Sequence, residues 1–523
     1  MTSALPTLEF NEGFRSAFHT MEDTDRHVFI TGRAGTGKST LLQYFRKNTK
    51  KAVAVLAPTG VAAVNVKGQT IHSFFNFKID ITPDSVRKIK PRDKNIYKKL
   101  DAIIIDEISM VRADLLDCVD IFLRLHGKTK KLPFGGIQMI FIGDLYQLPP
   151  VVTSRDKAFF MDYYKSPYFF GAVVFGDSNG FAMEFIELEK VYRQRDEHFL
   201  KLLNAVRNNT ATDDDMNEIN RRYITNFKER SGDFSIHLTT TNILAEGINT
   251  RKLADIKGRE YRYAGILEGD FETKDLPTGI EIVVKAGSQV MLLNNDPLGR
   301  WINGSIGKVM GIKKGDDTSD AIRVELSDGG IIDITPYKWE MYRFSYDKNK
   351  GMVISEAVGS FTQYPLKLAW AVTIHKSQGK TFERVIIDIG RGTFSHGQLY
   401  VALSRCTTLE GIILKQPVSK KNILMDRRVV NFVTKYQYHL AEKRLPFHEK
   451  ISFLEDAIKT GKQLEIVYLK TKDEKSKRVI TPLSVGELEY SGKRFPGLKA
   501  FCASRMEERV FHVERILEMR VKE

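Results

Sequence analysis

Residues 32–39 read GRAGTGKS, and this octapeptide sets the architecture expected for the whole 523-residue chain. It fits the phosphate-loop pattern G-x-x-x-x-G-K-[ST] at every specified position, with the apolar run His27–Thr31 before it and an amphipathic segment after it. The backbone N–H groups of such a loop surround phosphate oxygens, the lysine reaches the β- and γ-phosphates, and the serine ligates Mg²⁺. A chance glycine turn is the weaker interpretation in this context. The predicted nucleoside triphosphate site comprises Gly35, Thr36, Gly37, Lys38, Ser39 and Thr40.

Short apolar runs continue outward from this loop and alternate with helical stretches. Continuous Val/Ile-rich runs of this kind are typical of strands in a buried parallel sheet built from βαβ units. The functional loops of such a sheet gather at the carboxyl ends of its strands. Two later runs predict a second α/β domain. The runs are Ala52–Ala57, Ala102–Ile105 and Ile137–Ile142 for the first sheet, and Ser235–Thr241 and Arg384–Ile389 for the second.

The segment between residues 251 and 364 differs in composition and in hydrophobic pattern from the segments on either side. It is rich in glycine and aspartate, and turn signals separate short alternating strands, which predicts a small β-barrel inserted into the second α/β domain. The chain is then basic from about Lys415 to Lys450. A last unit begins at Ile451 with a short helix, which is followed by strands near Leu464–Lys470 and Arg478–Pro482. From there to the end, either strand or helix is expected. The strands expected in the insert are Glu281–Lys285, Gln289–Leu293, Ile306–Ile312, Ala321–Leu326 and Ile331–Thr335.

The composition indicates a globular protein with a polyanionic partner. Hydrophobic residues make up 42% of the chain and charged residues 28%, which excludes global disorder. Lys plus Arg total 80 and Asp plus Glu total 65, so the formal charge is +15, which favours nucleic acid as the partner and an anionic membrane second. The three cysteines, Cys118, Cys406 and Cys502, form no CxxC pair, which disfavours a zinc ribbon or a disulfide framework and fits a reducing cytoplasm. Neither a secretory signal nor an apolar run of about 18 residues is found, so no membrane association is expected.

Polar groups that suit phosphoryl transfer follow the predicted strands. Asp106 could hold Mg²⁺ through water and Glu107 could polarise the attacking water, although an Asp-Glu pair at a strand end is often only a solvated turn. Gln147, in GDLYQLPPV, could sense the γ-phosphate, and a rigid surface turn is the alternative. Arg193 and Arg405 could stabilise charge on the phosphoryl group from a second domain, whereas most arginines are solvated surface residues.

Taken in order, the segments GRAGTGKS, LAPTGVAA, DEIS, GDLYQLPPV, VYRQ, TIHKSQGKTFERV and YVALSR resemble the Pif-type DNA helicases of superfamily 1B. The stretch Ser109–Leu148 is similar to the signature segment of that family, and the resemblance extends over about residues 8 to 416. It implies two RecA-like domains and ATP-driven 5′ to 3′ translocation on single-stranded DNA with duplex unwinding.

The resemblance also implies roles for individual residues. It assigns Lys38, Glu107, Gln147, Arg193 and Arg405 to catalysis and Ser39 and Asp106 to Mg²⁺, with Glu383 near the ribose. Hydroxyl groups, backbone amides and lysine bind phosphate, and Phe or His can stack on bases, so the resemblance places DNA contacts in three segments. An ordinary structural histidine is the alternative at His72 and His375. The segments are Pro58-Thr59-Gly60, His72-Ser73-Phe74, and Thr373 with His375 and Lys376.

One segment departs from the family pattern. Many relatives carry an adenine-reading glutamine upstream of the phosphate loop, and here that region reads Leu8-Glu9-Phe10-Asn11-Glu12-Gly13, so Asn11 is the expected substitute and a strict preference for ATP is not implied. The basic segment Phe75–Leu100 matches the family's wedge element, with a solvated loop as an equal alternative.

The tail resembles a WYL domain, a small β-rich module, with Val467 where the name triplet has Trp. Its tyrosine and arginines could form a basic pocket for a nucleotide or single-stranded DNA, although the acidic Glu507 and Glu508 between them fit an ordinary salt-laced surface equally well. The residues concerned are Tyr468, Arg478, Arg494, Arg505, Arg509 and Arg515.

The predicted organisation is therefore α/β, with two RecA-like parallel-sheet domains, an inserted SH3-like β-barrel and a small C-terminal WYL-like domain. The expected boundaries are 1–182 for domain 1A with its wedge at about 75–100, 183–250 and 365–425 for domain 2A, 251–364 for the insert 2B, 426–450 for a basic linker and 451–523 for the tail domain. The expected ligands are ATP, Mg²⁺, single-stranded DNA and forked duplex, for a monomer in a bacterial cytoplasm close to the nucleoid. A nucleotide-dependent DNA-binding switch that unwinds nothing is the rival hypothesis.

Overall fold

A computed structural model describes residues 11–522, apart from short gaps, and the chain divides into two compact units. The first unit is Met1–Arg207 with Ala211–Leu424, and the second is Asn208–Thr210 with Met425–Glu523. No helix among the described residues is long and apolar enough to cross a membrane. The gaps are 79–80, 92, 94, 153–155, 157–159, 177–180, 193–195, 226, 228–233, 272, 274–275, 316–319, 348–351, 471–472 and 491–492.

The first unit opens with a six-stranded sheet in the order β3-β2-β4-β5-β1-β6, and all its strand pairs are parallel. The apolar runs expected as strands do form β1, β2, β4 and β5. This sheet extends past the expected boundary at residue 182, because β6 pairs in parallel with β1. The strands are β1 (His27–Gly32), β2 (Val53–Ala57), β3 (Gln69–Thr70), β4 (Ala102–Ile105), β5 (Gln138–Ile142) and β6 (Met183–Leu188).

Helices cover this sheet and bury it on both faces, which explains why its strands read as uninterrupted apolar runs. All four residues of β4 are buried, and α2 turns Leu41, Leu42 and Phe45 into the core, as its amphipathic pattern predicts. The helices before β5 are α1 (Glu12–Asp23), α2 (Lys38–Asn48), α3 (Gly60–Asn65), α4 (Ile71–Phe75), α5 (Pro83–Val86), α6 (Ile96–Lys99) and α7 (Ala113–His126).

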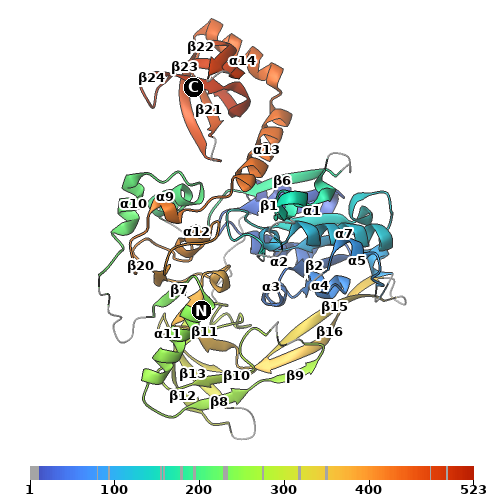
Figure 1. The fold of residues 1–523 in the computed structure, drawn as a ribbon, viewed down its shortest axis with the longest axis vertical. Helices are drawn as coiled ribbons and strands as arrows, with labels where there is room; N and C mark the ends of the chain where they lie inside the picture. Colours follow the sequence, from blue (N-terminus) through green and yellow to red (C-terminus); the bar gives the residue numbers. More distant parts are fainter. Residues whose placement is uncertain are drawn as a thin grey trace. The chain divides into compact units, whose positions relative to one another are not determined.

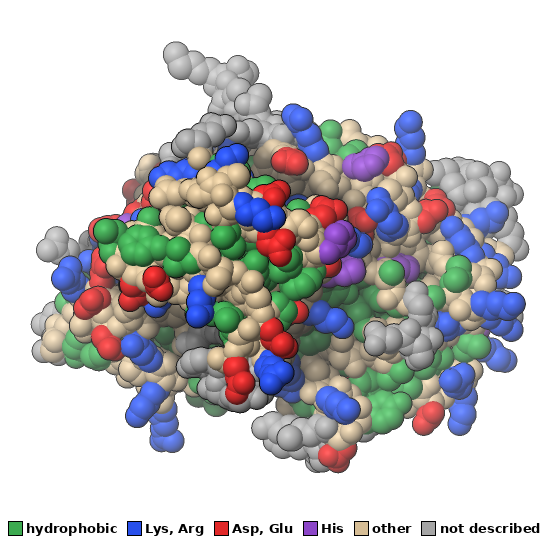
Figure 2. Space-filling model, turned by 90° about the horizontal axis from the view of Figure 1, so that it is seen from above, with side chains coloured by type: hydrophobic (Ala, Val, Ile, Leu, Met, Phe, Trp, Pro, Cys, Tyr) green, Lys and Arg blue, Asp and Glu red, His purple; other side chains and the backbone are tan. Residues whose placement is uncertain are grey.

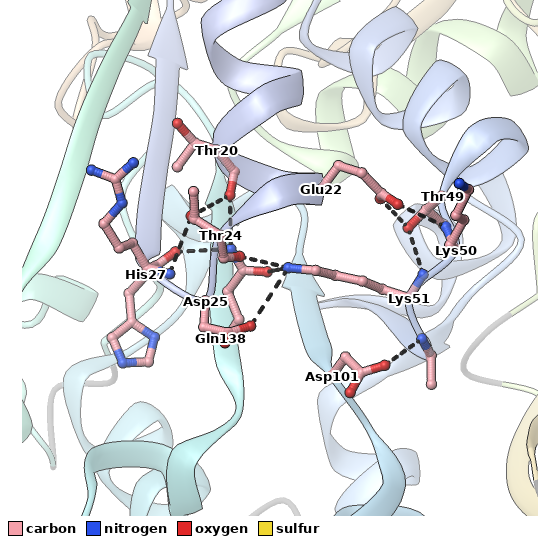
Figure 3. A network of polar contacts seen from close by, with 12 residues as sticks. Thr20, Glu22, Thr24, Asp25, His27, Thr49, Lys50, Lys51, Asp101 and Gln138 are labelled. Atoms are coloured by element: carbon pink, nitrogen blue, oxygen red, sulfur yellow. Dashed lines mark hydrogen bonds and ion pairs between the residues drawn. The ribbon is translucent and has the colours of Figure 1, made fainter.

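A polar network fastens the amino ends of the central strands (Figure 3). The Lys51 ammonium donates to the Thr24 carbonyl at 2.6 Å and to Gln138 Oε1 at 2.8 Å. The Gln138 amide nitrogen donates in turn to the carbonyls of Thr20 at 3.1 Å and Arg26 at 2.9 Å. The loops before β1, β2 and β5 are thus joined at the edge opposite the phosphate loop.

A second parallel sheet follows, in the order β18-β7-β19-β20. The predicted runs Ser235–Thr241 and Arg384–Ile389 contain β7 and β19. Ile236, Leu238, Val385 and Ile387 are all buried in its core. The elements of this part are α9 (Glu197–Arg207), α10 (Asp213–Asn220), β7 (Ile236–Thr239), α11 (Asn242–Asp255), β18 (Ala371–Thr373), β19 (Val385–Asp388), α12 (Gln398–Leu403) and β20 (Ile412–Leu414).

The insert between α11 and β18 is antiparallel β-structure. Its five-stranded sheet has the order β14-β13-β12-β11-β17, so it runs past the expected end at 364 because β17 pairs with β11. The long antiparallel pair β15 and β16 extends toward domain 1A (Figure 1), where β15 contacts α3, β3 and α6. The strands are β8 (Tyr261–Ala264), β9 (Ile266–Gly269), β10 (Glu281–Val284), β11 (Gln289–Leu292), β12 (Ile306–Lys313), β13 (Ala321–Leu326), β14 (Ile331–Ile334), β15 (Tyr337–Asp347), β16 (Met352–Gln363) and β17 (Leu366–Leu368).

The second unit carries two helices and a five-stranded antiparallel sheet in the order β24-β23-β22-β21-β25. The segment expected to be a linker, 426–450, forms α13 and the first turn of α14. After residue 482 the sequence predicts either strand or helix, and the chain there is mostly strand. The elements are α13 (Arg427–Arg444), α14 (Phe447–Thr460), β21 (Leu464–Leu469), β22 (Lys475–Tyr490), β23 (Lys493–Cys502), β24 (Glu507–His512) and β25 (Ile516–Val521).

Candidate functional site

The phosphate loop lies between β1 and α2, as its sequence predicts. Gly35 and Gly37 have φ values of 81° and 88°, which favour glycine, and Gly37 caps the amino end of α2. The Lys38 ammonium folds back over the loop and donates to the carbonyls of Gly32 at 2.8 Å and Arg33 at 3.0 Å. Ser39 and Thr40 are exposed on the first turn of α2. The loop therefore has its N–H groups, lysine and hydroxyl on one short segment.

Asp106 and Glu107 follow β4 and lie close enough to Lys38 for electrostatic interaction. Burial raises the pKa of Asp106, while a backbone hydrogen bond and Lys38 act against that rise. Burial raises the pKa of Glu107 to about 7, with the neighbouring Asp106 adding to the effect. Glu107 also has a φ of 50°, a left-handed conformation that is uncommon for a residue with a side chain. Strain and burial coincide at this residue.

The loop after β5 brings Gln147 close to Glu107, since one side chain, Gln378, contacts both residues. The Gln147 amide nitrogen donates to Asp144 Oδ2 at 3.3 Å, and Asp144 lies 3.5 Å from the Arg207 guanidinium. Arg207 comes from α9 and stacks over the Tyr146 ring at 3.8 Å. The side chains of Gln147, Asp144, Arg207 and Tyr146 are all buried. Sequence reasoning did not single out Arg207, because nothing in its local pattern links it to residue 144.

Domain 2A contacts both loops from the other side. The Tyr400 hydroxyl accepts a hydrogen bond from the Ala34 N–H at 3.1 Å, inside the phosphate loop. Gly397 lies so close to the loop after β5 that an added Cβ would stand 2.3 Å from the Tyr146 carbonyl oxygen. Helix α12 and its capping residue therefore face the phosphate loop and the Gln147 loop directly.

Arg405 is buried and belongs to this same face. Its guanidinium donates to the carbonyls of Ser377 at 3.4 Å and Lys380 at 3.2 Å, and it interacts electrostatically with Glu107. The structure thus brings Lys38, Asp106, Glu107, Gln147 and Arg405 into one region, whereas Arg193 lies outside the described residues. Glu383 is exposed, and its carbonyl accepts from the Cys406 thiol at 3.2 Å.

Two residues beside the site were not predicted. The Gln378 amide nitrogen donates to Glu107 Oε2 and to Gln147 Oε1, both at 3.0 Å. Tyr192 is exposed, its N–H donates to the Gly35 carbonyl at 2.8 Å, and its ring lies beside Gly37. The side chain of Asn11 caps α1 through the Phe14 N–H and donates to the Tyr192 hydroxyl at 3.1 Å, so its amide is engaged in both directions.

The segments expected to contact DNA lie at the carboxyl ends of strands. Pro58-Thr59-Gly60 follows β2, where Thr59 caps α3, and Ser73 accepts from Gln69 at 3.0 Å. Phe74 corrects an expectation, because its ring is only 6% exposed and packs on Phe75 and Tyr97 instead of standing free to stack on a base. His72 is half-buried.

The third such segment follows β18. Thr373 is buried and its hydroxyl accepts from the Lys376 N–H at 3.2 Å, while the Lys376 side chain is exposed. His375 stacks with Phe394 at a centroid distance of 6.5 Å, and burial lowers the pKa of its imidazole. Of this segment, Lys376 is the side chain that remains open to a ligand.

The expected wedge is an anchored element. Phe75, Phe77 and Tyr97 pack on Phe122 of α7, and α6 contacts β15. Its basic residues Lys88, Lys90 and Lys98 are exposed, and Arg92 and Lys94 lie outside the described residues. On the face drawn in Figure 2, lysine and arginine side chains project at many places with acidic ones between them. The net charge is therefore spread out on that face.

In the second unit, a cavity of about 590 Å³ opens beside β24. Tyr468, Arg478 and Arg509 line it together with Lys470, whereas Arg494, Arg505 and Arg515 do not. Glu507 and Glu508 also line it, and Glu507 pairs with Arg509 at 3.0 Å. With Phe511 also in its lining, the cavity combines three basic side chains, two aromatic rings and two carboxylates.

Comparisons with known proteins agree with this geometry. Family models match residues 10–217 as "PIF1-like helicase", 368–411 as "UvrD-like helicase C-terminal domain" and 449–521 as "WYL domain". The chain is 33% identical over 423 residues to the ATP-dependent DNA helicase Pif1 of Bdellovibrio bacteriovorus, covering 79% of this chain and 89% of that one. It is 32% identical to human ATP-dependent DNA helicase PIF1, over 74% of this chain and 57% of the human protein.

Solved structures give the same result. Pif1 from Bacteroides sp in complex with ADP-AlF4 is 34% identical and superimposes with a TM-score of 0.73, covering 82% of this chain and 97% of that one. The ssDNA-bound form of Bacteroides Pif1 is 35% identical over the same shares, with a TM-score of 0.59.

Proposed function

The chain belongs to the PIF1-like family of ATP-dependent DNA helicases, and from that membership we propose that it moves 5′ to 3′ along single-stranded DNA and separates the duplex ahead of it. One observation supports this most: Tyr400 of α12 meets the phosphate loop, and Gly397, which caps α12, meets the Gln147 loop of the first sheet. A nucleotide between these surfaces touches both domains. Its hydrolysis can therefore change their separation, and alternating grip on DNA turns that change into movement.

In this proposal, each residue of the site has a separate role in ATP binding or hydrolysis. Lys38 exchanges the carbonyls of Gly32 and Arg33 for phosphate oxygens, and Gln147 positions the attacking water. Glu107, half-buried and with a raised pKa, accepts the proton of that water. Arg405 and Arg193 stabilise the charge that develops on the phosphoryl group. Glu383 lies toward the ribose.

The oxygen donors present suit Mg²⁺, which prefers a few protein oxygens together with water and substrate phosphates. The exposed Ser39 hydroxyl, in the first turn of α2, and the Asp106 carboxylate, which follows β4, would hold it. When bound, the ion neutralises phosphate charge. Tyr192, beside Gly37, offers a ring surface for the base, and an aromatic face discriminates weakly among bases, which fits the absence of an upstream glutamine.

We also infer the DNA path and the setting. Pro58-Thr59-Gly60, His72-Ser73 and Thr373 with His375 and Lys376 contact single-stranded DNA, and the segment 75–100 meets the fork. One similar solved structure concerns DNA unwinding at forked double-stranded DNA by two coordinating Pif1 helicases. For this chain we propose translocation as a monomer in the nucleoid. The antiparallel insert serves as the SH3-like accessory domain.

A strand-separation assay tests the polarity. Duplexes with a 5′ single-stranded tail should be unwound in the presence of ATP and Mg²⁺, and duplexes with a 3′ tail should remain paired. The rival hypothesis of a nucleotide-gated DNA-binding switch predicts ATP-dependent binding of both substrates without strand separation. Unwinding from a 3′ tail would contradict the proposed direction.

The tail cavity is proposed to bind a phosphate-bearing ligand, either a nucleotide or single-stranded DNA. Because Arg478 and Arg509 line it, reversing either charge to glutamate in the full chain should weaken binding of single-stranded DNA by about fivefold, and binding of the unchanged chain should fall with added salt. Fluorescence anisotropy measures both effects. Arg494→Glu, on an exposed side chain outside the cavity, is the matched control and should bind as the unchanged chain does. Equal weakening by Arg494→Glu would refute the cavity assignment.

A further inference from the structure

Gln378 joins the two halves of the hydrolysis site with one side chain. Its amide nitrogen carries two hydrogens and donates both, to Glu107 Oε2 and to Gln147 Oε1 at 3.0 Å each. Glu107 follows β4 and Gln147 follows β5, so these acceptors belong to different loops of the first sheet. Gln378 itself comes from the second sheet's side of the site. It is therefore a direct polar bridge between the two sheets.

The backbone around Gln378 is held tightly. The Ser377 hydroxyl donates to the Ile374 carbonyl at 2.7 Å, and the buried Arg405 guanidinium donates to the carbonyls of Ser377 and Lys380. The Lys380 ammonium donates to Asn303 Oδ1 at 2.5 Å. A segment restrained at several points moves as a unit, so a shift of Lys376 is passed on to Gln378.

We propose that Gln378 is a positioning residue that couples occupancy of the DNA segment Thr373–Lys376 to the placement of Glu107 and Gln147. The inference rests on the proposed function, in which Lys376 touches DNA while Glu107 and Gln147 act on ATP. Gln378 touches neither ligand. It holds the carboxylate that accepts the proton and the amide that orients the water at a fixed separation, and a bound strand fixes the segment from which it reaches.

An amide suits this position better than other groups of the same size. A methionine would fill the space but leave the partly buried Glu107 and Gln147 oxygens without their donor. A glutamate would place a second carboxyl group against Glu107, whose pKa is already raised by desolvation and by the neighbouring Asp106 carboxylate. Both replacements keep the length of the side chain, so they separate hydrogen bonding from packing.

The test measures ATP hydrolysis by the full-length chain with and without saturating single-stranded DNA. Gln378→Met removes both hydrogen bonds, and loss of the one to the Glu107 carboxylate by itself should lower the DNA-stimulated kcat by about tenfold. Gln378→Glu should lower it by more than about thirtyfold. The rate without DNA should fall by a smaller factor, so the stimulation ratio shrinks. The KM for ATP and the Kd for DNA should stay within about twofold, since neither ligand is contacted.

Gln416→Met is the matched control. Gln416 lies in the same domain and its amide donates to the Gly390 carbonyl at 2.5 Å, away from Glu107. This variant should keep the stimulation ratio of the unchanged chain. Three outcomes overturn the inference: an unchanged stimulated kcat in Gln378→Met, an equal fall with and without DNA, or a joint change of kcat, KM and Kd. If the unchanged chain itself shows no stimulation by DNA, the proposed function fails instead.

Discussion

Lys38→Ala should lower the DNA-stimulated rate of ATP hydrolysis by about a thousandfold, the upper range for removing one donor aimed at developing charge. The Lys38 ammonium lies over the loop carbonyls of Gly32 and Arg33 and within electrostatic reach of Asp106 and Glu107. The other lysine of α2, Lys47, lies exposed in the last turn of the helix, at the end away from the phosphate loop. A phosphate-release assay at saturating ATP and DNA measures the change.

Lys47→Ala removes the same charge from the same helix and should keep the rate within about twofold, as surface substitutions usually do. Single-stranded DNA binding should persist in Lys38→Ala, because the segments proposed to touch DNA follow β2, β3 and β18. Hydrolysis near the normal rate in Lys38→Ala would show that the phosphate loop is not the hydrolysis site.

Glu107→Gln should bind ATP with unchanged affinity and turn it over about a thousandfold more slowly. The substitution keeps the shape of the side chain and removes the carboxylate that would accept the proton of the attacking water. It also leaves an oxygen for the Gln378 amide, so the bridge at 3.0 Å can persist. Single-turnover hydrolysis with an equilibrium measurement of nucleotide binding separates chemistry from affinity.

The matched control is Glu246→Gln, on an exposed residue of α11. It loses the same charge and should hydrolyse ATP normally. If Glu107→Gln loses affinity and turnover together, its role is nucleotide binding. A normal turnover would transfer the role of general base to another carboxylate.

The parallel sheets could be predicted because strands that are buried on both faces consist of continuous apolar residues. Ala102–Ile105 and Gln138–Ile142 are fully buried strands, and they read as unbroken apolar runs. The insert was harder. Its long strands β15 and β16 mix aromatic, charged and glycine residues, which gives no regular alternation, and they lie beyond the last strand that was expected there. Strand β6, which joins the first sheet beyond the expected boundary at residue 182, is only partly buried at the sheet edge and gives a weaker apolar pattern.

Some residues of the site can likewise be found from a local sequence motif, whereas others are defined only by contacts with residues far away along the chain. Lys38, Glu107 and Gln147 follow strands directly, so a motif locates them. Gln378 makes its contacts with partners 271 and 231 positions away along the chain, and no local pattern reports such a contact. Asn11 has the pattern of a helix cap, an Asn followed by an acidic first turn, and that simpler role is the one its side chain performs in α1. Phe74 was expected at a surface because of its motif, but its aromatic neighbours Phe75 and Phe77 are the signal of a buried cluster.

The Lys51 and Gln138 network makes the first sheet unequal in stiffness from one end to the other. Its hydrogen bonds brace the amino termini of the strands, and the opposite rim consists of glycine turns and a strained Glu107. We therefore expect deformation during ATP hydrolysis at the rim and between the two sheets, with the strands beneath as a fixed frame of reference for both.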